Sequence, residues 1–306
     1  MTRFSLRLIS LITLGCLGLV LLALVVGRIL PAEDEIVFSG NLDQRDYEIY
    51  RMALGRQLSV RLSHNQANNT NPDWSPDGHQ IVFVSDQSGS NILYVMNDEG
   101  GNVHVLTDPL DGNQDNPMWS PDGQSIAYIF IQRANHFVYN PQLMLFDLRT
   151  QTNRYLTNNI DNVLAPYWSP DSTQIAYIRA SPANFTYDIY SLAVQTGVTL
   201  PLTDTPRNEF SPAWSPDGRM IAHEEDSPSG IYLLDIGDQK STLLYGPTNN
   251  STINNWSPDG RYILYTGVAA NRLSHIYKLN VHDCLQASED CAPQLLFPEF
   301  KAGSYT

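Results

Sequence analysis

Three sets of side chains in this chain have types and spacings that could support chemistry: seven histidines, five regularly spaced aspartates and five regularly spaced asparagines. Histidines and carboxylates hold metals and move protons, and amide side chains form hydrogen bonds to peptides and sugars. The histidines share no common position relative to the aspartates, which favours surface or core roles and predicts neither a metal site nor a cofactor. They are His64, His79, His104, His136, His223, His275 and His282.

The aspartates belong to a signature, Trp-Ser-Pro-Asp-Gly, that occurs five times. Its tryptophans are Trp74, Trp119, Trp168, Trp214 and Trp256, and its aspartates are Asp77, Asp122, Asp171, Asp217 and Asp259. One carboxylate per turn falls far short of the roughly six to eight oxygens that calcium takes. Proline, aspartate and glycine in this order predict a tight turn that the aspartate caps and in which the glycine is left-handed. Ser172 replaces the glycine once, and we expect local strain there.

The signature repeats at the length of a propeller blade. Successive tryptophans are 45, 49, 46 and 42 residues apart, and a four-stranded blade takes about 40–50 residues. Short apolar runs that predict strands follow each signature, as at 81–83, 92–94 and 105–106 in the first copy. One tryptophan per blade on an inner strand predicts packing between blades rather than a ligand site. The alternation of signature and strands predicts an all-β propeller.

A further unit lacks a signature but has matching strands at 36–38, 47–50 and 60–62, which raises the predicted number of blades to six. Its missing inner strand is expected from residues 300–306, with Tyr305 where other blades place tryptophan. Pairing the C-terminal strand with the first blade would close the ring and remove exposed sheet edges. The predicted domain is 31–306, with units of approximately 36–80, 81–125, 126–174, 175–220, 221–262 and 263–306.

An asparagine stands six residues before every signature tryptophan. These asparagines are Asn68, Asn113, Asn162, Asn208 and Asn250. In a propeller this position lies in the loop between the outer strand of one blade and the inner strand of the next, near the mouth of the central channel. The asparagines either shape these loops through a left-handed backbone and Asx turns, or form a ring of amides that binds a peptide or sugar.

A long loop, residues 130–141, is expected at the same mouth. It carries Arg133, His136, Phe137 and Tyr139, and aromatic residues beside arginine are typical of binding hot spots. The alternative is a loop that packs on its own blade. These four residues and the five asparagines are the candidate partner-binding residues.

The N-terminus predicts a transmembrane signal anchor within residues 1–30. Residues 8–27 form an apolar run of 20 residues without charge, and at about 1.5 Å per residue such a helix spans the hydrocarbon layer. A cleaved signal peptide has a shorter apolar stretch, and Cys16 is a poor match to a lipoprotein site. Arg3 and Arg7 precede the run, so we expect a cytoplasmic N-terminus and an extracytoplasmic propeller.

Charge and cysteine usage agree with that location. The formal net charge of −14 disfavours nucleic acid as a partner, because an acidic surface repels phosphate. Cys284 and Cys291 flank a polar stretch, and in an oxidising compartment we expect them to form a disulfide. Two unrelated thiols are the alternative.

The five signatures, with flanks such as Asn71-Pro-Asp before Trp74 and Leu106-Thr107, resemble the WD40-like repeat of the TolB family of periplasmic propellers. The resemblance covers nearly everything from residue 36 onward and implies the fold. It also implies a non-catalytic role in binding an envelope protein. Residues 31–35, between the apolar run and the first strand, leave no room for the α/β domain that precedes the propeller in TolB.

The binding role implied by this resemblance, together with the anchor predicted from residues 8–27, predicts a membrane-anchored, extracytoplasmic module that binds a protein, peptide or glycan. The same repeat occurs in propellers attached to serine peptidases, but the Gly-x-Ser-x-Gly nucleophile motif of their catalytic domain is absent from this sequence. The alternative is a propeller enzyme, a metal-dependent hydrolase or lyase with its site at the central channel.

Overall fold

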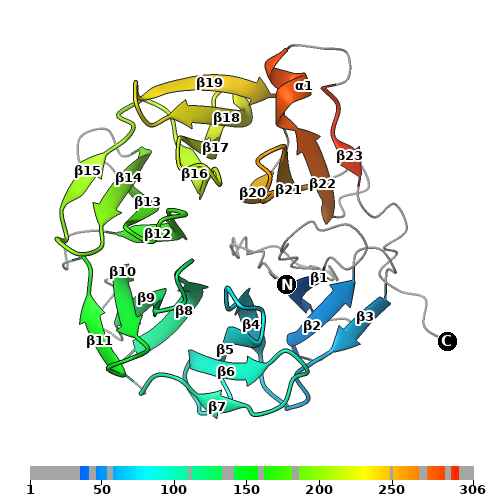
Figure 1. The fold of residues 1–306 in the computed structure, drawn as a ribbon, viewed down its shortest axis with the longest axis vertical. Coiled ribbons are helices and arrows are strands. Elements are labelled where there is room, and N and C mark those ends of the chain that lie inside the picture. The colour runs from blue at the N-terminus through cyan, green and yellow to red at the C-terminus, as the bar shows by residue number, and fades with distance from the viewer. Residues whose placement is uncertain are drawn as a thin grey trace.

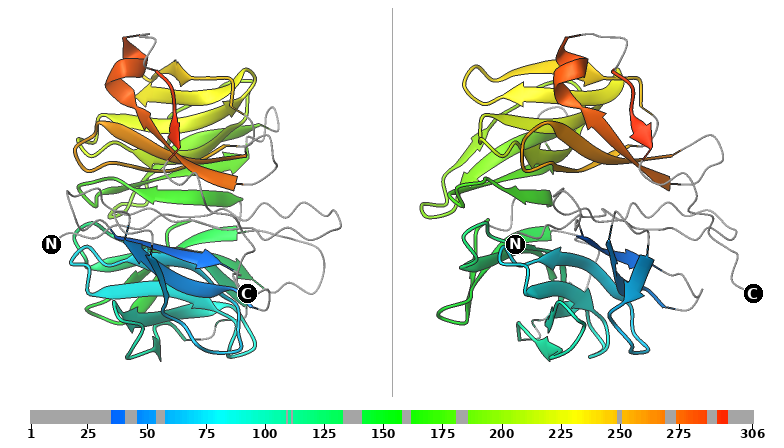
Figure 2. Two further views of the ribbon diagram at one scale, coloured as in Figure 1. Left: turned by 90° about the vertical axis from the view of Figure 1, so that its right-hand side faces the viewer. Right: turned by 45° about the vertical axis from the view of Figure 1, so that its right-hand side comes forward.

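The computed structural model describes residues 35–40, 46–53, 58–108, 110, 112–132, 141–157, 162–180, 186–248, 251–268, 274–286 and 291–295. Within these ranges six antiparallel sheets stand around a central axis as the blades of a β-propeller (Figure 1). In side view, the strands of each sheet are inclined and the sheets are arranged around that axis (Figure 2). The prediction of an all-β fold with six blades is confirmed.

Each sheet is formed by strands that are consecutive in the chain, and the first-numbered strand of the four-stranded sheets is the innermost. The first sheet has three described strands, β1 (Glu35–Gly40), β2 (Glu48–Ala53) and β3 (Leu58–Arg61). The next two comprise β4 (Asn69–Trp74), β5 (Gln80–Ser85), β6 (Ile92–Asn97) and β7 (His104–Val105), then β8 (Gly112–Trp119), β9 (Ser125–Gln132), β10 (Pro141–Asp147) and β11 (Thr152–Tyr155).

The last three sheets repeat this order. They comprise β12 (Val163–Trp168), β13 (Gln174–Ala180), β14 (Tyr187–Ala193) and β15 (Thr199–Pro201), then β16 (Glu209–Trp214), β17 (Met220–Asp226), β18 (Ser229–Asp235) and β19 (Lys240–Tyr245), then β20 (Thr252–Trp256), β21 (Tyr262–Val268), β22 (Ser274–Asn280) and β23 (Gln294–Leu295). The predicted sequence units run from the second strand of one sheet to the first strand of the next. A unit and a sheet are therefore offset by one strand.

The signature forms the turn between the two innermost strands of each sheet, and its aspartate caps that turn. In all five copies the serine Oγ donates to the aspartate Oδ1 at 2.6 Å. The same Oδ1 accepts the N–H two residues later, at 3.0 Å from His79 to Asp77 and 3.1 Å from Arg219 to Asp217. These bonds favour the ionised carboxylate, and the serine bond is the main cause of the lowered pKa of Asp77 and Asp217.

The one signature without glycine keeps the same backbone. Ser172 has φ of 61°, close to the 70–72° of Gly78, Gly123, Gly218 and Gly260. A side chain in this left-handed region is disfavoured, as the sequence predicts. The serine adds a contact that glycine lacks, because its Oγ accepts a hydrogen bond from the Asp122 N–H of the preceding blade at 3.0 Å.

The signature tryptophans form the core between blades. Each indole lies in an apolar cluster shared with the preceding sheet; Trp74, for example, packs with Val37 and Ile49 of the first sheet. The other four occupy the equivalent clusters between successive blades. All five are at most 8% exposed. Two also bond across the gap, since Trp168 Nε1 donates to the Met118 carbonyl at 3.3 Å and Trp256 Nε1 to the Ala213 carbonyl at 3.0 Å.

A short helix interrupts the last blade. Helix α1 (Val281–Leu285) follows β22, and Asn280 caps it by accepting the Asp283 N–H. Cys284 of this helix forms a disulfide with Cys291, with 4.5 Å between their Cα atoms. The predicted disulfide is confirmed. Both cysteines also pack against the apolar cluster between the fifth and sixth blades, so the bridge ties α1 to the core.

Two predictions about the architecture fall outside the described residues: the N-terminal anchor within 1–30, and ring closure by residues 300–306. In the part of the chain that the structure describes, no helix has the length and apolar character needed to cross a membrane.

Removing one turn cap should destabilise the propeller at neutral pH. We expect Asp77→Ala to lower the free energy of unfolding by about 1 kcal/mol, because two hydrogen bonds to the carboxylate are lost. The folded-state pKa of Asp77 is lowered, so the contribution is complete above the unfolded pKa of about 4 and is lost as pH falls through the folded value. Urea unfolding at pH 7 and pH 3 checks this. Glu99→Ala, which removes an exposed carboxylate, is the control; equal effects of both variants at pH 7 would contradict the capping role.

Candidate functional site

A β-bulge in each inner strand sets which side chains reach the channel. In four of these strands a proline stands two residues before the signature tryptophan, and the residue before it has φ of 47–49°: Asn71, Asn116, Ala165 and Ser211. The register with the neighbouring strand shifts at the same place, and it does so at the corresponding position of β20. Proline is tolerated because the inner strand is an edge and a bulge needs no ladder N–H there.

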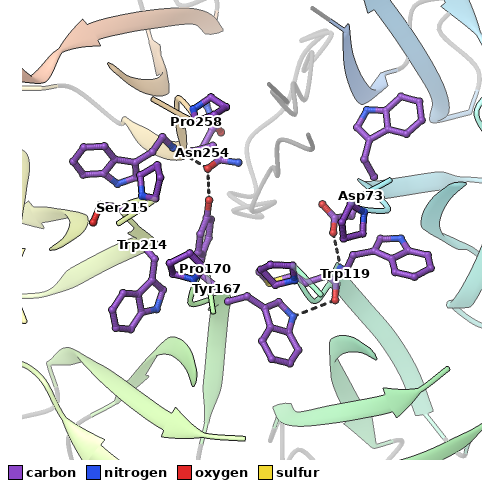
Figure 3. Close-up of a pocket in the computed structure, with 16 residues that line it drawn as sticks. Asp73, Trp119, Tyr167, Pro170, Trp214, Ser215, Asn254 and Pro258 are labelled. Carbon is purple, nitrogen blue, oxygen red and sulfur yellow. Dashed lines mark hydrogen bonds between the residues drawn. The ribbon is translucent and has the colours of Figure 1, made fainter. Parts of the chain in front are cut away.

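A pocket of about 360 Å³ lies at the signature end of the channel and is built by five blades. Its walls repeat around the ring, with the tryptophan and the proline of every signature contributing (Figure 3). The residues that break the repeat precede the tryptophans, and they are Asp73, Met118, Tyr167, Asn254 and Asn255. The signature serine Ser215 also lines the pocket. Pockets of this kind, mostly apolar with a few placed polar groups, are typical of ligand sites.

One hydrogen bond spans the pocket. The Tyr167 hydroxyl, on the fourth blade, donates to Asn255 Oδ1 on the sixth (Figure 3). The fifth blade, between them, places the small Ala213 at the equivalent position, and Tyr167 packs against the apolar cluster that contains it. Asn255 Oδ1 also accepts the Trp256 N–H at 2.8 Å, so this wall of the pocket is held by two bonds to one oxygen.

Asp73 stands on a different wall of the pocket from Tyr167 (Figure 3). Its Oδ2 accepts the backbone N–H of Trp119 on the next blade at 2.7 Å. Asp73 is 8% exposed. A carboxylate in this position joins two blades and places negative charge against the pocket.

At the other end of the inner strands, asparagines link the blades. Asn208 Oδ1 accepts the Tyr187 N–H of the preceding blade at 3.0 Å, while its Nδ2 donates to Asp226 Oδ2 at 2.6 Å. Asn68 makes the equivalent bonds to Tyr47 and Asp86 at 3.4 and 2.8 Å.

Asn113 Oδ1 accepts the Asn91 N–H at 3.4 Å, and Asn162 is half-buried at the same position before β12. The predicted left-handed backbone is not found at Asn68, Asn113, Asn162 or Asn208; it falls three residues later, in the bulge. Asn68, Asn113 and Asn208 thus have a structural role, whereas Asn162 Oδ1 is buried without a hydrogen-bond partner among the described residues. The predicted binding of a partner by the asparagines stays a prediction. They lie about 20 Å from the signature end, given about 3.3 Å per residue of strand.

Asn250, Arg133, His136, Phe137 and Tyr139 lie outside the described residues, so the predicted loop site is not placed. Four of the other histidines are exposed, at positions 64, 79, 104 and 282. In the described ranges, no group of three His, Cys, Asp or Glu side chains is arranged to hold a metal ion.

The fifth blade buries glutamates that sequence reasoning did not single out, together with His223, one of the seven histidines. Burial raises the pKa of Glu224 to about 8 and that of Glu209 to about 7. Glu209 is stabilised by hydroxyl donors, Thr205 at 2.6 Å and Thr203 at 2.9 Å. Burial lowers the pKa of His223 to about 4, so the imidazole is neutral at pH 7 and pairs with Ser241 Oγ at 2.9 Å. His223 stacks on Tyr232 where other blades stack two aromatic rings.

The pocket residues were also missed. A signal for them exists in the sequence: the residue just before each signature tryptophan differs from copy to copy, while the signature that follows it repeats. The Asn71-Pro-Asp flank of the first signature contains this position but does not reveal that it faces the channel, because that depends on the bulge.

Comparison with known proteins agrees with the fold. Two overlapping segments, residues 28–162 and 125–288, match the family model of the TolB beta propeller domain, PD40. The chain belongs to this family. Among solved structures this TolB-type propeller is similar to TolB from Acinetobacter baumannii, with a TM-score of 0.67 and 20% identity over 82% of this chain and 62% of that chain.

Other similar proteins are enzymes. An oligogalacturonate lyase in complex with manganese has a TM-score of 0.66 and 16% identity over 85% of this chain and 73% of that chain. A segment of 51 residues is 45% identical to the uncharacterized peptidase YuxL of Bacillus subtilis (strain 168), which is 16% of this chain and 8% of the peptidase. The chain thus spans less than two thirds of the length of TolB and of YuxL. The two structural matches show that these proteins share the propeller fold of this chain.

The asparagine links should contribute to stability. We expect Asn208→Ala to lower the free energy of unfolding by about 1–2 kcal/mol, because bonds to Tyr187 and Asp226 on two blades are lost together. Thermal and urea unfolding measure the effect. Gln195→Ala, an exposed amide without such bonds, is the control. An unchanged melting temperature for Asn208→Ala would contradict the structural role and favour the partner-binding interpretation.

Glu224 should make stability fall as pH rises. Its folded-state pKa, about 8, lies above the unfolded value, so its contribution is complete below about pH 4 and is lost up to pH 8, by about 1 kcal/mol per pH unit. Relative to the wild type, Glu224→Gln should therefore become more stable between pH 5 and 8 in urea titrations. Glu99→Gln controls for loss of an exposed acid. Parallel wild-type and Glu224→Gln stability curves would contradict the assignment.

Proposed function

We propose that this TolB-type propeller is a non-catalytic binding module, anchored in a membrane by its N-terminus, that captures a protein or peptide partner at the signature end of its channel. The pocket carries the proposal, because five blades converge on one mostly apolar cavity with a few directed polar groups. Such a composition suits recognition of a side chain or short segment. The carboxylate in its wall, Asp73, already binds a backbone N–H.

The location part of the proposal rests on residues 8–27 and on the disulfide. An apolar run of that length with arginines before it supports an anchor with the propeller on the outer side. The bridge between Cys284 and Cys291 supports an oxidising compartment. By similarity to TolB, we also propose that the partner is a protein of the cell envelope.

Site-specific photocrosslinking in native membranes tests the proposal. A benzoylphenylalanine placed at Gln124, an exposed residue at the signature end, should yield adducts with a discrete partner. The same group at Leu200, 60% exposed on the outer strand β15, is the matched control and should not. A third position, Ser88, lies in the turn after β5 at the asparagine end.

Adducts from Ser88 but not from Gln124 would move the binding site to the asparagine loops, as the sequence predicts. No adducts from either end would contradict the binding role. The alternative function, a metal-dependent hydrolase or lyase, would be indicated by stoichiometric Mn, Ca or Zn in the purified chain that chelation removes.

A further inference from the structure

The pocket separates positions that build the fold from positions that can select a ligand. Its tryptophans and prolines recur in five blades and take the same structural places, so they distinguish no ligand orientation. The residue before each tryptophan differs in every blade: Asp73, Met118, Tyr167, Ala213 and Asn255. Selectivity must therefore come from this position and its immediate neighbours.

Among the five residues at this position, one is acidic and none is basic. Of the described residues that line the pocket, Asp73 alone is acidic, and no lysine, arginine or histidine is present. The rest of the wall is proline, aromatic ring and Met118, with a hydroxyl at Ser215 and amides at Asn254 and Asn255. A carboxylate beside apolar surface matches a long side chain that has an aliphatic stem and a cationic head.

The signature turns next to the pocket also carry acidic residues. An aspartate stands next in sequence to each of the five pocket prolines. Neighbouring turns touch, as the Asp122 to Ser172 bond shows. Arg219 and Arg261 follow two of them, and Arg261 Nε lies 3.5 Å from Asp259 Oδ2, so the acids still outnumber the bases among the signature turns.

We propose that the pocket binds an arginine or lysine side chain of a peptide partner, with the cationic head at Asp73 and the stem against the prolines and Met118. This deepens the proposed function and rests on it. The cavity of about 360 Å³ is at the lower end of ligand sites and suits one long side chain. The acidic signature turns would draw a basic segment toward the mouth.

The chain provides its own reporter for this site. All 5 tryptophans of the sequence are signature residues, and all of them line the pocket. Intrinsic tryptophan fluorescence of the full chain in mild detergent therefore reports on this cavity. The probes are acetylated, amidated pentapeptides, Ala-Ala-Arg-Ala-Ala and its variants with Lys, Gln or Glu at the centre.

We expect the Arg and Lys peptides to bind at least about ten-fold more tightly than the Gln peptide, with a preference that falls as salt is added. Asp73→Asn should reduce that preference about ten-fold. Asn255→Asp should strengthen binding of the Arg peptide, because it adds a carboxylate to the pocket and keeps the acceptor oxygen for Tyr167 and Trp256. Glu99→Gln, which removes an acid outside the pocket lining, should leave the preference unchanged.

Asn255→Asp guards against a folding artefact, since a damaged pocket cannot give tighter binding; near-UV circular dichroism checks Asp73→Asn. Equal affinity for the Arg and Gln peptides, or equal effects of Asp73→Asn and Glu99→Gln, would overturn the proposal. So would a saturating fluorescence change with calcium chloride alone that blocks the Arg peptide. A third outcome separates the two proposals. If Gln124 crosslinks to a partner but the peptides bind without a preference for a positive charge, this inference is overturned and the proposed binding module stands.

Discussion

The structure depends on one repeated interaction, the burial of a signature indole between two neighbouring blades. Each sheet has apolar side chains on both faces, and no sheet can bury both faces by itself. The tryptophan closes the gap near the axis, where inner strands converge, and replacing such a ring with alanine typically costs about 3–5 kcal/mol. In two interfaces the indole N–H also bonds a carbonyl of the preceding blade. The blades are therefore held at fixed positions around the channel.

That rigidity explains how a repetitive chain builds an irregular site. The bulge before each tryptophan turns one residue toward the channel, and the turn after it places a proline at the mouth. The residue before the tryptophan varies in type, and it meets the neighbouring blade differently in each case: Asp73 accepts the Trp119 N–H, whereas Met118 and Ala213 belong to apolar clusters between blades. The bond from Tyr167 to Asn255 reaches further, since it joins the fourth and sixth blades. A symmetric frame thus supports an asymmetric pocket.

Much of the fold could be predicted because its signals are local. The turn, the strands and the blade length follow from short patterns, and the disulfide from two cysteines seven residues apart. The pocket could not be predicted, because it depends on strand register at the bulge and on Tyr167 and Asn255, which are 88 residues apart. The asparagines show a third case: the pattern is real, but its meaning, a link to the preceding blade, requires the position of Tyr187 or Tyr47. The raised pKa of Glu224 likewise arises from neighbours that no local pattern identifies.

The order of strands within each blade has a consequence for synthesis of the chain. Every described four-stranded sheet uses consecutive strands, innermost first, so each can complete its hydrogen bonds as soon as its own segment has been made. Such nearest-neighbour assembly favours folding that propagates from one end. Once a blade has formed, its leading apolar face is covered when the tryptophan of the next blade packs against it. A nascent propeller therefore has two open surfaces, the free face of the first blade and the leading face of the newest one, and their number does not grow as blades are added.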